Sequence, residues 1–302
     1  MSNQIIAYGW YNHNNLGDDL MLVALQNLFK TKIIPTDNIC SIKYCKGIIF
    51  GGGSILQDKP NINDDILSKL IDKEIPIYYI GIGKETSVHP VHQKLLEVAV
   101  IKKFRDVDIP DLVYSLNFSK NKYTNNKILI IPNVQVVPTW DEAHWKHTAW
   151  EHFKNEFAQS LDALSVTFDF ACFCHNDVMT DIWPISEICA RRKRNTKNNI
   201  IEYSSLLKSL SNLDSSIISN YNCIITQRYH GIVLAEKLGV PYIAICHHDK
   251  LKNSKPHRGN FLSYHSIQKS QIISAIENTN KFEPYNPDIL EYTKGFSCFQ
   301  DL

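Results

Sequence analysis

The chain has 302 residues, 44% of them hydrophobic, and its 32 Lys and Arg residues almost balance its 31 Asp and Glu residues. That length favours two ordinary domains over one large core. The balanced charge excludes a bulk field that would attract nucleic acid or an anionic membrane, so an anionic ligand must be bound by local groups.

Residues 1–11 lack the basic and apolar parts of a signal peptide. No later stretch approaches the roughly 18 apolar residues of a membrane span. We therefore expect a cytoplasmic protein without a transmembrane segment, for which peripheral membrane contact and the oligomeric state stay open. The eight cysteines form no paired C-x-x-C units, so we expect free, buried thiols rather than a structural zinc site.

Short apolar segments alternate with Gly- or Asn-rich turns and helical patterns along the whole chain. They predict strands over residues 4–8, 47–50 and 77–80 and an amphipathic helix over 18–29. A second series has strands over 165–173, 222–226 and 242–245 and a helix over 232–238. Such strands are typical of parallel sheets with helices on both faces. The expected fold class is α/β, with two Rossmann-like domains.

A candidate junction between the domains lies within residues 131–152, which are rich in proline and tryptophan. We place the boundary near Thr139, with an N-terminal domain over 1–138 and a C-terminal domain over 139–302. Trp140 and Trp145 are candidates for stacking on sugar rings, and packing at a hinge is an equal alternative. A basic run over 191–197 is interpreted as a solvated surface or as a contact for an anionic acceptor.

The turn after the first strand is the first candidate site, because ligands of open α/β sheets bind beyond the carboxyl ends of strands. Asn12 and Asn15 can hydrogen-bond sugar hydroxyls, and Gly17 permits close approach of backbone. Asp18 and Asp19 open the predicted helix. Asp18 is a candidate helix cap, and either carboxylate is a candidate catalytic base.

A second candidate site follows the strand over 47–50, where Gly51, Gly52 and Gly53 precede Ser54 and, further on, Asp58. Three glycines free backbone N–H groups to face a ligand. The segment is not a P-loop and lacks the G-x-G-x-x-G pattern. A tight turn without a ligand explains it equally well.

The third candidate site is the sharpest, because Arg228 and His230 stand between a strand ending at Thr226 and a helix ending at Gly239. Helix N-termini bind anions through free N–H groups and the helix dipole. Together with Gly231, these residues predict a pocket for a phosphate or carboxylate. The alternatives are a structural histidine and an arginine paired with a nearby carboxylate.

Residues 12–19, 51–58 and 226–241 resemble, in the same order, three motifs of the polysaccharide pyruvyl transferase family. These are G-x-x-N-x-G-D-[DE], GGG-S-x-x-x-D and [ST]-x-R-x-H-G-x-x-[LI]-A-x-x-x-G-[VI]-P. The chain departs from the family in having GDD for GDE and Lys84 where proline is common. The resemblance implies a GT-B-like fold, two domains facing a cleft, with an acceptor side in the first domain and a donor side in the second.

The resemblance also implies a function, which is transfer of the carboxyethylidene group of phosphoenolpyruvate onto sugar hydroxyls of a glycan or glycan precursor, as a ketal. Phosphoenolpyruvate is then the co-substrate, and no metal or cofactor is needed. The donor-binding residues implied are His230, Lys250 and Arg105, with Lys252 and Lys255 as alternatives to Lys250. Since an imidazole changes its charge near neutral pH, His230 is the candidate general acid.

Two other functions stay open on the sequence. A GT-B glycosyltransferase with a nucleotide-sugar donor would need an acidic residue for the ribose, and Glu236 is the candidate considered. A carbohydrate-binding or scaffold protein without catalysis is the other alternative, since a fold does not fix a function. The triplet over 247–249, His-His-Asp, is interpreted as a donor or acceptor contact rather than a metal site.

Overall fold

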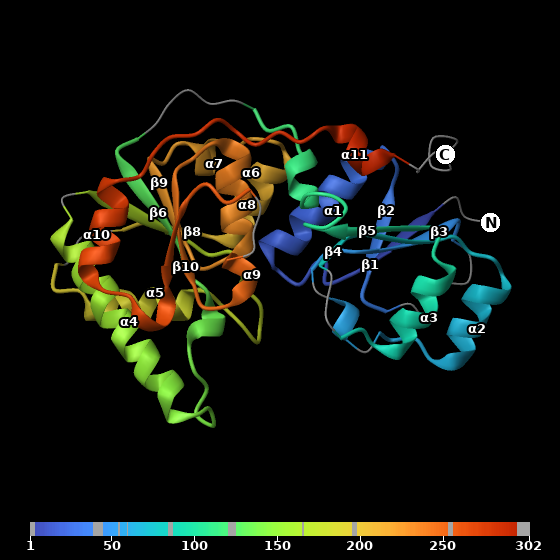
Figure 1. The fold of residues 1–302 in the computed structure, drawn as a ribbon, viewed down its shortest axis with the longest axis horizontal. Coiled ribbons are helices and arrows are strands. Elements are labelled where there is room, and N and C mark those ends of the chain that lie inside the picture. Colours follow the sequence, from blue (N-terminus) through green and yellow to red (C-terminus); the bar gives the residue numbers. More distant parts are fainter. Residues whose placement is uncertain are drawn as a thin grey trace. The chain divides into compact units, whose positions relative to one another are not determined.

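The computed structural model describes residues 4–38, 45–53, 55–58, 60–83, 87–119, 125–164, 166–194, 198–252 and 256–294. The chain divides into two compact units, one formed by Met1–Asn117 with Asn286–Leu302 and the other by Phe118–Tyr285. Each unit contains a parallel sheet flanked by helices (Figure 1). The expected α/β class with two Rossmann-like domains is therefore confirmed.

The first unit has five parallel strands in the order β2-β1-β3-β4-β5. These strands are β1 (Ile5–Tyr8), β2 (Ile33–Thr36), β3 (Gly47–Gly51), β4 (Ile77–Gly83) and β5 (Ile101–Arg105). Its helical elements are α1 (Leu16–Phe29), η2 (Ile55–Gln57), α2 (Asp64–Asp72), α3 (Pro90–Val98), η3 (Leu112–Ser115) and α11 (Ile289–Thr293).

The second unit has six parallel strands in the order β11-β10-β9-β6-β7-β8. These strands are β6 (Lys127–Ile131), β7 (Thr167–Ala171), β8 (Ile200–Ile201), β9 (Cys223–Thr226), β10 (Tyr242–Cys246) and β11 (Asn260–Ser263). Its helical elements are η4 (Val134–Val136), α4 (His144–Ala163), α5 (Ile182–Arg191), α6 (Tyr203–Ser211), α7 (Ser216–Ser219), α8 (Tyr229–Leu238), α9 (Asp249–Lys252), η5 (Tyr264–Ser266) and α10 (Lys269–Glu277).

Both strand orders are doubly wound, and each contains one point where the order reverses. Numbered within its own unit, the first sheet runs 2-1-3-4-5 and the second runs 3-2-1-4-5-6. The reversal lies between β1 and β3 in the first sheet and between β6 and β9 in the second. Ligands of such sheets bind beyond the carboxyl ends of the strands at this point. Each of the three candidate motifs follows a different one of these four strands, namely β1, β3 and β9.

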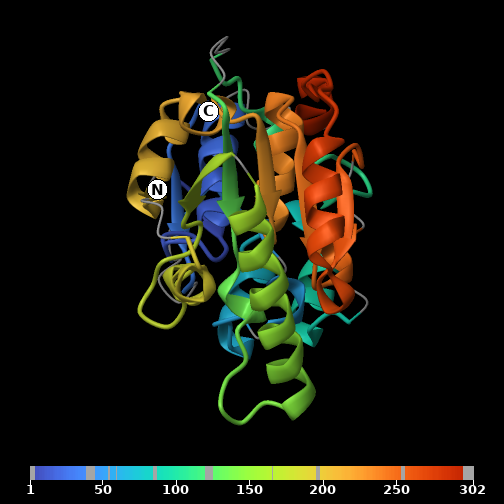
Figure 2. The same ribbon diagram turned by 90° about the vertical axis from the view of Figure 1, so that its left-hand side faces the viewer.

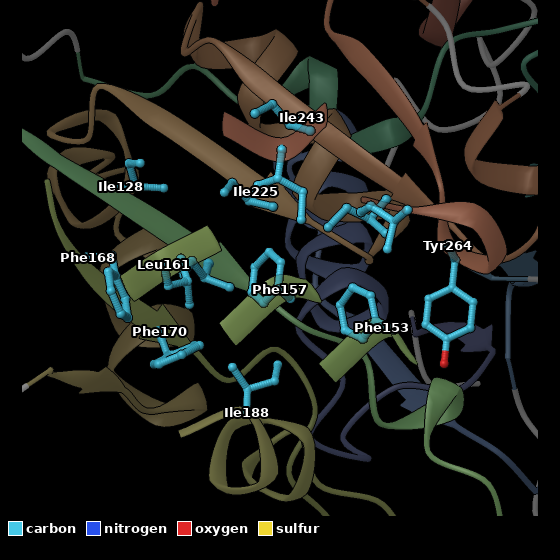
Figure 3. Close-up of a cluster of buried hydrophobic side chains, with 14 of the residues drawn as sticks. Ile128, Phe153, Phe157, Leu161, Phe168, Phe170, Ile188, Ile225, Ile243 and Tyr264 are labelled. Carbon is cyan, nitrogen blue, oxygen red and sulfur yellow. The ribbon is translucent and has the colours of Figure 1, made fainter. Parts of the chain in front are cut away.

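The core of the second unit shows why its strands are almost wholly apolar. Helices α4, α5 and α10 cover one face of the sheet, and α6 and α8 lie on the other (Figure 1). Figure 2 looks onto the first layer, in which α4 lies between α5 and α10. Figure 3 shows Phe153, Phe157 and Leu161 of α4 packed against strand residues such as Ile225. Burial on both faces selects apolar side chains at every strand position.

The predicted domain boundary near Thr139 is wrong, because β6 belongs to the second unit. Its residues Ile128 to Ile130 pair with both β7 and β9 in the middle of the second sheet. The chain therefore enters the second unit near Phe118, and it returns to the first unit after Tyr285. The apolar run over 128–131, directly before Pro132, was the signal for this strand.

Two predicted helix starts are also corrected. Helix α1 begins at Leu16 with Asn15 as its N-cap, so Asp18 lies inside the first turn and does not cap the helix. Helix α8 begins at Tyr229 rather than at residue 232, which brings His230 into its first turn. No helix in the described part of the chain is long and apolar enough to cross a membrane. Of the described free thiols, Cys189 is exposed and Cys45 is half-buried, contrary to expectation.

A buried histidine in the first unit makes stability depend on pH. His92 of α3 is fully buried, and its Nδ1 lies 3.1 Å from the Tyr79 hydroxyl. Burial, with a smaller effect of His89, lowers the pKa of His92 to about 4. The unfolded chain has the ordinary value of about 6.5, so it binds a proton that the folded chain excludes.

We expect the free energy of unfolding to fall as the pH drops from about 6.5 to about 4, with about 3 kcal/mol from His92. Urea unfolding at several pH values measures this slope. His92→Gln keeps a polar partner for Tyr79 but does not titrate, so its slope should be shallower over the same window. Equal slopes in the two proteins would contradict the assignment to His92.

Candidate functional site

The turn after β1 in the first unit brings two buried carboxylates to the N-terminal turn of α1. The side chains of Asp18 and Asp19 are buried, and Asp19 Oδ1 accepts a hydrogen bond of 2.6 Å from the Asn12 backbone N–H. Asn12 adopts a left-handed backbone with φ of 62°, which asparagine tolerates better than most residues. Carboxylates in the first turn are also favoured by the helix dipole. The turn therefore fits a structural role and leaves the predicted role as a base open.

The glycine turn after β3 packs against the turn after β1. Gly52 has φ of 78°, and a Cβ there would lie 3.0 Å from the Tyr11 ring and hydroxyl. A Cβ on Gly53, with φ of 64°, would lie 3.0 Å from Asp18 Oδ1. Both positions therefore need glycine for conformation and for space. The two predicted motifs are neighbours, as the reversal between β1 and β3 requires.

Tyr11 is a residue of this turn that the sequence did not single out. Its ring is buried, and its hydroxyl has no hydrogen-bond partner in the part of the chain that is described. Burial raises the pKa of Tyr11 well above its usual range, and the charges of Asp18 and Asp19 add to the shift. The phenol therefore stays protonated beside the two carboxylates.

The other predicted residues of the first unit lie in different settings. Gly17 is buried in the first turn of α1, and Asp58 is exposed after η2. Ser54 lies outside the described residues. Arg105, at the end of β5, is buried and forms ion pairs of 3.4 Å with Asp111 and 3.9 Å with Asp106. Its charge is thus balanced within the first unit, and its predicted donor contact stays a prediction.

In the second unit, the turn from β9 into α8 is built around a buried ion pair. Arg228, the N-cap residue of α8, donates from its guanidinium to Asp181, whose side chain is 0% exposed. Burial alone would lower the pKa of Arg228, but the Asp181 charge, the hydrogen bond to Asp181 and the nearby Cys174 and Cys172 together raise it. The arginine is therefore always charged and held in one orientation.

Asp181 also accepts three backbone hydrogen bonds, from Val134 at 3.0 Å, Phe173 at 3.1 Å and Cys174 at 2.9 Å. This carboxylate thereby joins the loops after β6 and β7 to the start of α8. The sequence did not identify it, because it lies in the stretch from residue 108 to 215 without a recognised motif. The only local signal was its place just before the helix over 182–191.

Three polar residues connect the loops after β6, β9 and β10. The Asn133 backbone N–H donates to Gln227 Oε1 at 3.1 Å, and Asn133 Nδ2 donates to His247 Nε2 at 3.3 Å. Asn133 Oδ1 accepts from the Gln135 N–H, which fixes the orientation of the amide. Burial, followed by the charges of His248 and Arg228, lowers the pKa of His247 to about 4. The imidazole is therefore neutral and carries its hydrogen on Nδ1.

This arrangement leaves buried N–H donors without acceptors at the reversal point of the second sheet. Within the described residues, Nε of Arg228 and Nε2 of Gln227 have no hydrogen-bond partner. Nδ1 of His247 is also buried, and it interacts weakly with the Ile245 carbonyl, outside hydrogen-bond geometry. Unpaired buried donors are rare in folded proteins, and a role in binding or catalysis is one explanation for them. We define Asn133, Asp181, Gln227, Arg228 and His247 as the switch-point cluster.

His230 and Lys250 both lie beside Tyr229, next to this cluster. The His230 and Tyr229 ring centroids are 5.2 Å apart, and Lys250 Nζ is 5.2 Å from the centre of the Tyr229 ring. Lys252 instead lies 3.6 Å from Asp249, and Lys255 is outside the described residues. The predicted residues His230 and Lys250 thus both lie against the ring of Tyr229.

Gly231 has a packing role at this helix start. A Cβ on Gly231 would lie 2.2 Å from Thr226 Oγ1, which also accepts the Arg228 N–H at 2.9 Å. Glycine therefore allows α8 to approach the end of β9, and this close approach positions Arg228.

Ion pairs bear on two further sequence predictions, which concern the basic run over 191–197 and the role of Glu236. In the basic run, Arg191 pairs with Glu151 and Arg192 with Asp162, so two of the four basic residues in its described part, 191–194, are paired with carboxylates. Glu236 is fully buried and accepts hydrogen bonds from the Tyr242 hydroxyl at 2.8 Å and from the Arg258 backbone at 3.0 Å. Arg258 also pairs with it through its side chain. Glu236 therefore has a structural role and is not positioned to hold a ribose.

The described residues contain no group of three or more His, Cys, Asp or Glu side chains arranged to hold a metal ion. In the triplet over 247–249, His247 is directed to Asn133, and His248 Nδ1 accepts the Lys250 backbone N–H at 3.1 Å. The two imidazoles therefore serve different partners. The interpretation of the triplet as a ligand contact remains a prediction.

Two Rossmann-like units with polar clusters at their reversal points define an α/β protein of the GT-B-like class. No protein-family model and no curated protein matches the chain. Solved structures do. A Listeria monocytogenes protein assigned as a UDP-N-acetylglucosamine 2-epimerase matches with a TM-score of 0.56 and 9% identity, over 99% of this chain and 97% of that one.

A second match is the UDP-GlcNAc 2-epimerase of Methanocaldococcus jannaschii, solved with UDP-GlcNAc and UDP. It has a TM-score of 0.52 and 12% identity, and the alignment covers 100% of both chains. At such low identity the likeness establishes the fold alone. The GT-B-like architecture expected from the motifs is thereby confirmed.

Proposed function

We propose that the chain is a sugar-processing enzyme, and specifically a transferase that moves the carboxyethylidene group of phosphoenolpyruvate onto two hydroxyls of a sugar. The observation that carries this proposal is the set of buried, unpaired N–H donors in the switch-point cluster, at the N-terminus of α8. Phosphoenolpyruvate has a phosphate and a carboxylate and so requires several such donors together. Two residues of the cluster, Gln227 and Arg228, lie in the third family motif.

The proposed reaction balances without a further reactant. The methylene carbon of phosphoenolpyruvate accepts a proton, and the oxygen of one sugar hydroxyl bonds to C2. The second hydroxyl oxygen then bonds to C2, and the bond from C2 to the phosphate oxygen breaks. The two sugar hydroxyls release two protons. One balances the proton that the methylene carbon gained on becoming a methyl group, and the other leaves with inorganic phosphate.

Each named residue has one role in this proposal. Arg228 and Lys250 bind the anionic groups of the donor, the first as a planar fork and the second as a point charge. Asp181 is a positioning residue that orients Arg228. His230 donates the proton to the methylene carbon, and Asp18 or Asp19 is the candidate acceptor of a hydroxyl proton.

A second candidate function is the use of a nucleotide sugar, which the likeness to the Methanocaldococcus jannaschii structure solved with UDP-GlcNAc and UDP favours. The helix start at His230 would then hold a diphosphate. The burial of Glu236 in its pair with Arg258 weighs against this candidate, because it removes the acidic residue considered for the ribose. A non-catalytic carbohydrate-binding protein is the third candidate.

A thermal-shift titration with phosphoenolpyruvate and with UDP-GlcNAc tests the proposal. Phosphoenolpyruvate at about 100 times its dissociation constant should add about 2.7 kcal/mol of stability. Lys250→Ala should weaken this binding at least tenfold, because it removes a charge-assisted contact. Lys252→Ala is the matched control, since it removes an exposed lysine of the same helix, and it should bind normally.

Stabilisation by UDP-GlcNAc but not by phosphoenolpyruvate would overturn the proposal in favour of the second candidate. Loss of phosphoenolpyruvate binding in Lys252→Ala, with normal binding in Lys250→Ala, would overturn the assignment of Lys250 alone. No response to either ligand would favour the non-catalytic candidate.

A further inference from the structure

A groove of about 610 Å³ lies between the first turns of α4 and η5, within the second unit. It is lined by His144, Trp145, Thr148, Ala149, His152 and His265. Its volume lies in the range of small-molecule sites, which is about 300–1,000 Å³. In Figures 1 and 2, the N-terminal turns of α4 project beyond the rest of the second unit.

Trp145 forms an exposed aromatic wall of this groove. Its side chain is 59% exposed, whereas Trp150 and Phe153 of the same helix are buried in the core. The indole is flanked by the His265 ring, with centroids 6.0 Å apart, and by Lys146, whose Nζ lies 5.9 Å from the centre of the indole ring. Exposed tryptophan that is held in place by neighbours is common at binding surfaces, because it combines a large apolar face with a polar edge.

The polar groups of the groove are positioned before any ligand arrives. His152 Nε2 lies 2.8 Å from the Ile267 carbonyl, and because a carbonyl only accepts, Nε2 carries the hydrogen. Nδ1 of neutral His152 is therefore an acceptor. The Thr148 hydroxyl donates to the His144 carbonyl at 3.2 Å and retains lone pairs that accept.

The buried side chain of Tyr264 lies between the groove and the switch-point cluster and makes edge-to-face contacts with a histidine of each. The Tyr264 ring lies 6.5 Å from His247 of the cluster and 5.1 Å from His265 of the groove. Element η5 follows β11 directly, so both sites lie at the carboxyl edge of the second sheet. The groove and the cluster therefore contact the same tyrosine ring.

The chemistry of the lining selects a neutral ligand that is apolar on one face and rich in hydroxyls. Among the described residues, no Asp, Glu, Lys or Arg lines the groove, and the nearby Lys146 is paired with Glu142. Pyranose rings have this character, since their C–H faces pack on aromatic rings and their hydroxyls hydrogen-bond to imidazole and hydroxyl groups.

We propose that this groove binds a neutral pyranose of a glycan, with Trp145 as the stacking surface. The identification of that glycan as the acceptor rests on the proposed function, whereas the binding itself requires no donor.

Saturation-transfer NMR with neutral oligosaccharides of hexoses and N-acetylhexosamines, without phosphoenolpyruvate, tests the proposal. The unmodified protein should transfer saturation to at least one of them. Trp145→Ala should weaken this binding at least tenfold, and His265→Ala should weaken it in the same direction. Trp183→Ala is the matched control, because Trp183 is 56% exposed on α5 and lies outside the groove. This variant should bind the oligosaccharide normally.

Failure of every oligosaccharide to bind at millimolar concentration, or equal binding by Trp145→Ala, would overturn the proposal. It would also be overturned if Trp145→Ala abolished binding to anionic phospholipid vesicles while no oligosaccharide bound. If turnover is observed, Trp145→Ala should raise KM for the acceptor and leave KM for phosphoenolpyruvate unchanged. Glycan binding that depends on Trp145 but occurs without turnover would support the groove and contradict the proposed function.

Discussion

Replacing Asp181 by alanine should lower the free energy of unfolding by about 3–5 kcal/mol, the usual result of removing one partner of a buried ion pair. The Arg228 guanidinium, whose side chain is 12% exposed, would be left charged and unpaired. The backbone N–H groups of Val134, Phe173 and Cys174 would lose their acceptor at the same time. Urea unfolding measures the change.

Two variants separate the charge from the hydrogen bonds. Asp181→Asn keeps an oxygen acceptor but loses the charge, so its stability should lie between those of the unmodified protein and Asp181→Ala. The double variant Asp181→Ala with Arg228→Met removes both charges of this pair. Its loss of unfolding free energy should be smaller than the sum of the losses in the two single variants. A loss below about 1 kcal/mol in Asp181→Ala would show that the pair does not hold these loops together.

Replacing His230 by alanine should slow phosphoenolpyruvate-dependent ketal formation by about 10²- to 10⁴-fold, the usual contribution of a general acid. The reason is that protonation of the methylene carbon precedes bonding of the sugar oxygens to C2. Release of inorganic phosphate in the presence of an acceptor measures the rate. Binding of phosphoenolpyruvate by the variant, followed by thermal shift, should fall by much less than the rate.

His257→Ala is the control for this experiment, since His257 is exposed in the same unit and stacks on Phe261. It should keep the normal rate. A nearly normal rate in His230→Ala would remove the residue from the proposed mechanism. An equal loss of rate and of donor affinity would assign it to donor binding rather than to proton transfer.

Much of the fold could be predicted because parallel strands covered on both faces leave a plain trace in the sequence. The run 47–50 and the run 242–245 are wholly apolar apart from Gly47 and Tyr242, and each was predicted as a strand. The strand Lys127–Ile131 was missed although Ile128 to Ile131 are apolar, because the prolines that follow were given to a domain junction. The boundary was misplaced for the same reason.

The predicted site residues were found where a motif marks a strand end. Arg228, His230 and Gly231 lie at the start of α8, and Asp18 lies in the first turn of α1, as chain order alone implied. Their partners were not predictable in this way. Asn133 and Asp181 meet Gln227 and Arg228 across 94 and 47 residues of sequence, and no local pattern records such a pairing.

The sequence by itself determined the α/β class, two domains, and the positions of three turns that face the carboxyl ends of strands, because periodicity and glycine are local properties. Only the tertiary structure decided which side chains complete each turn. It directed Glu236 to Arg258, enclosed Asp181 beneath Arg228 and left Trp145 exposed beside His265. Burial and charge pairing depend on which strands become neighbours, and strand order is not encoded in any single segment of the chain.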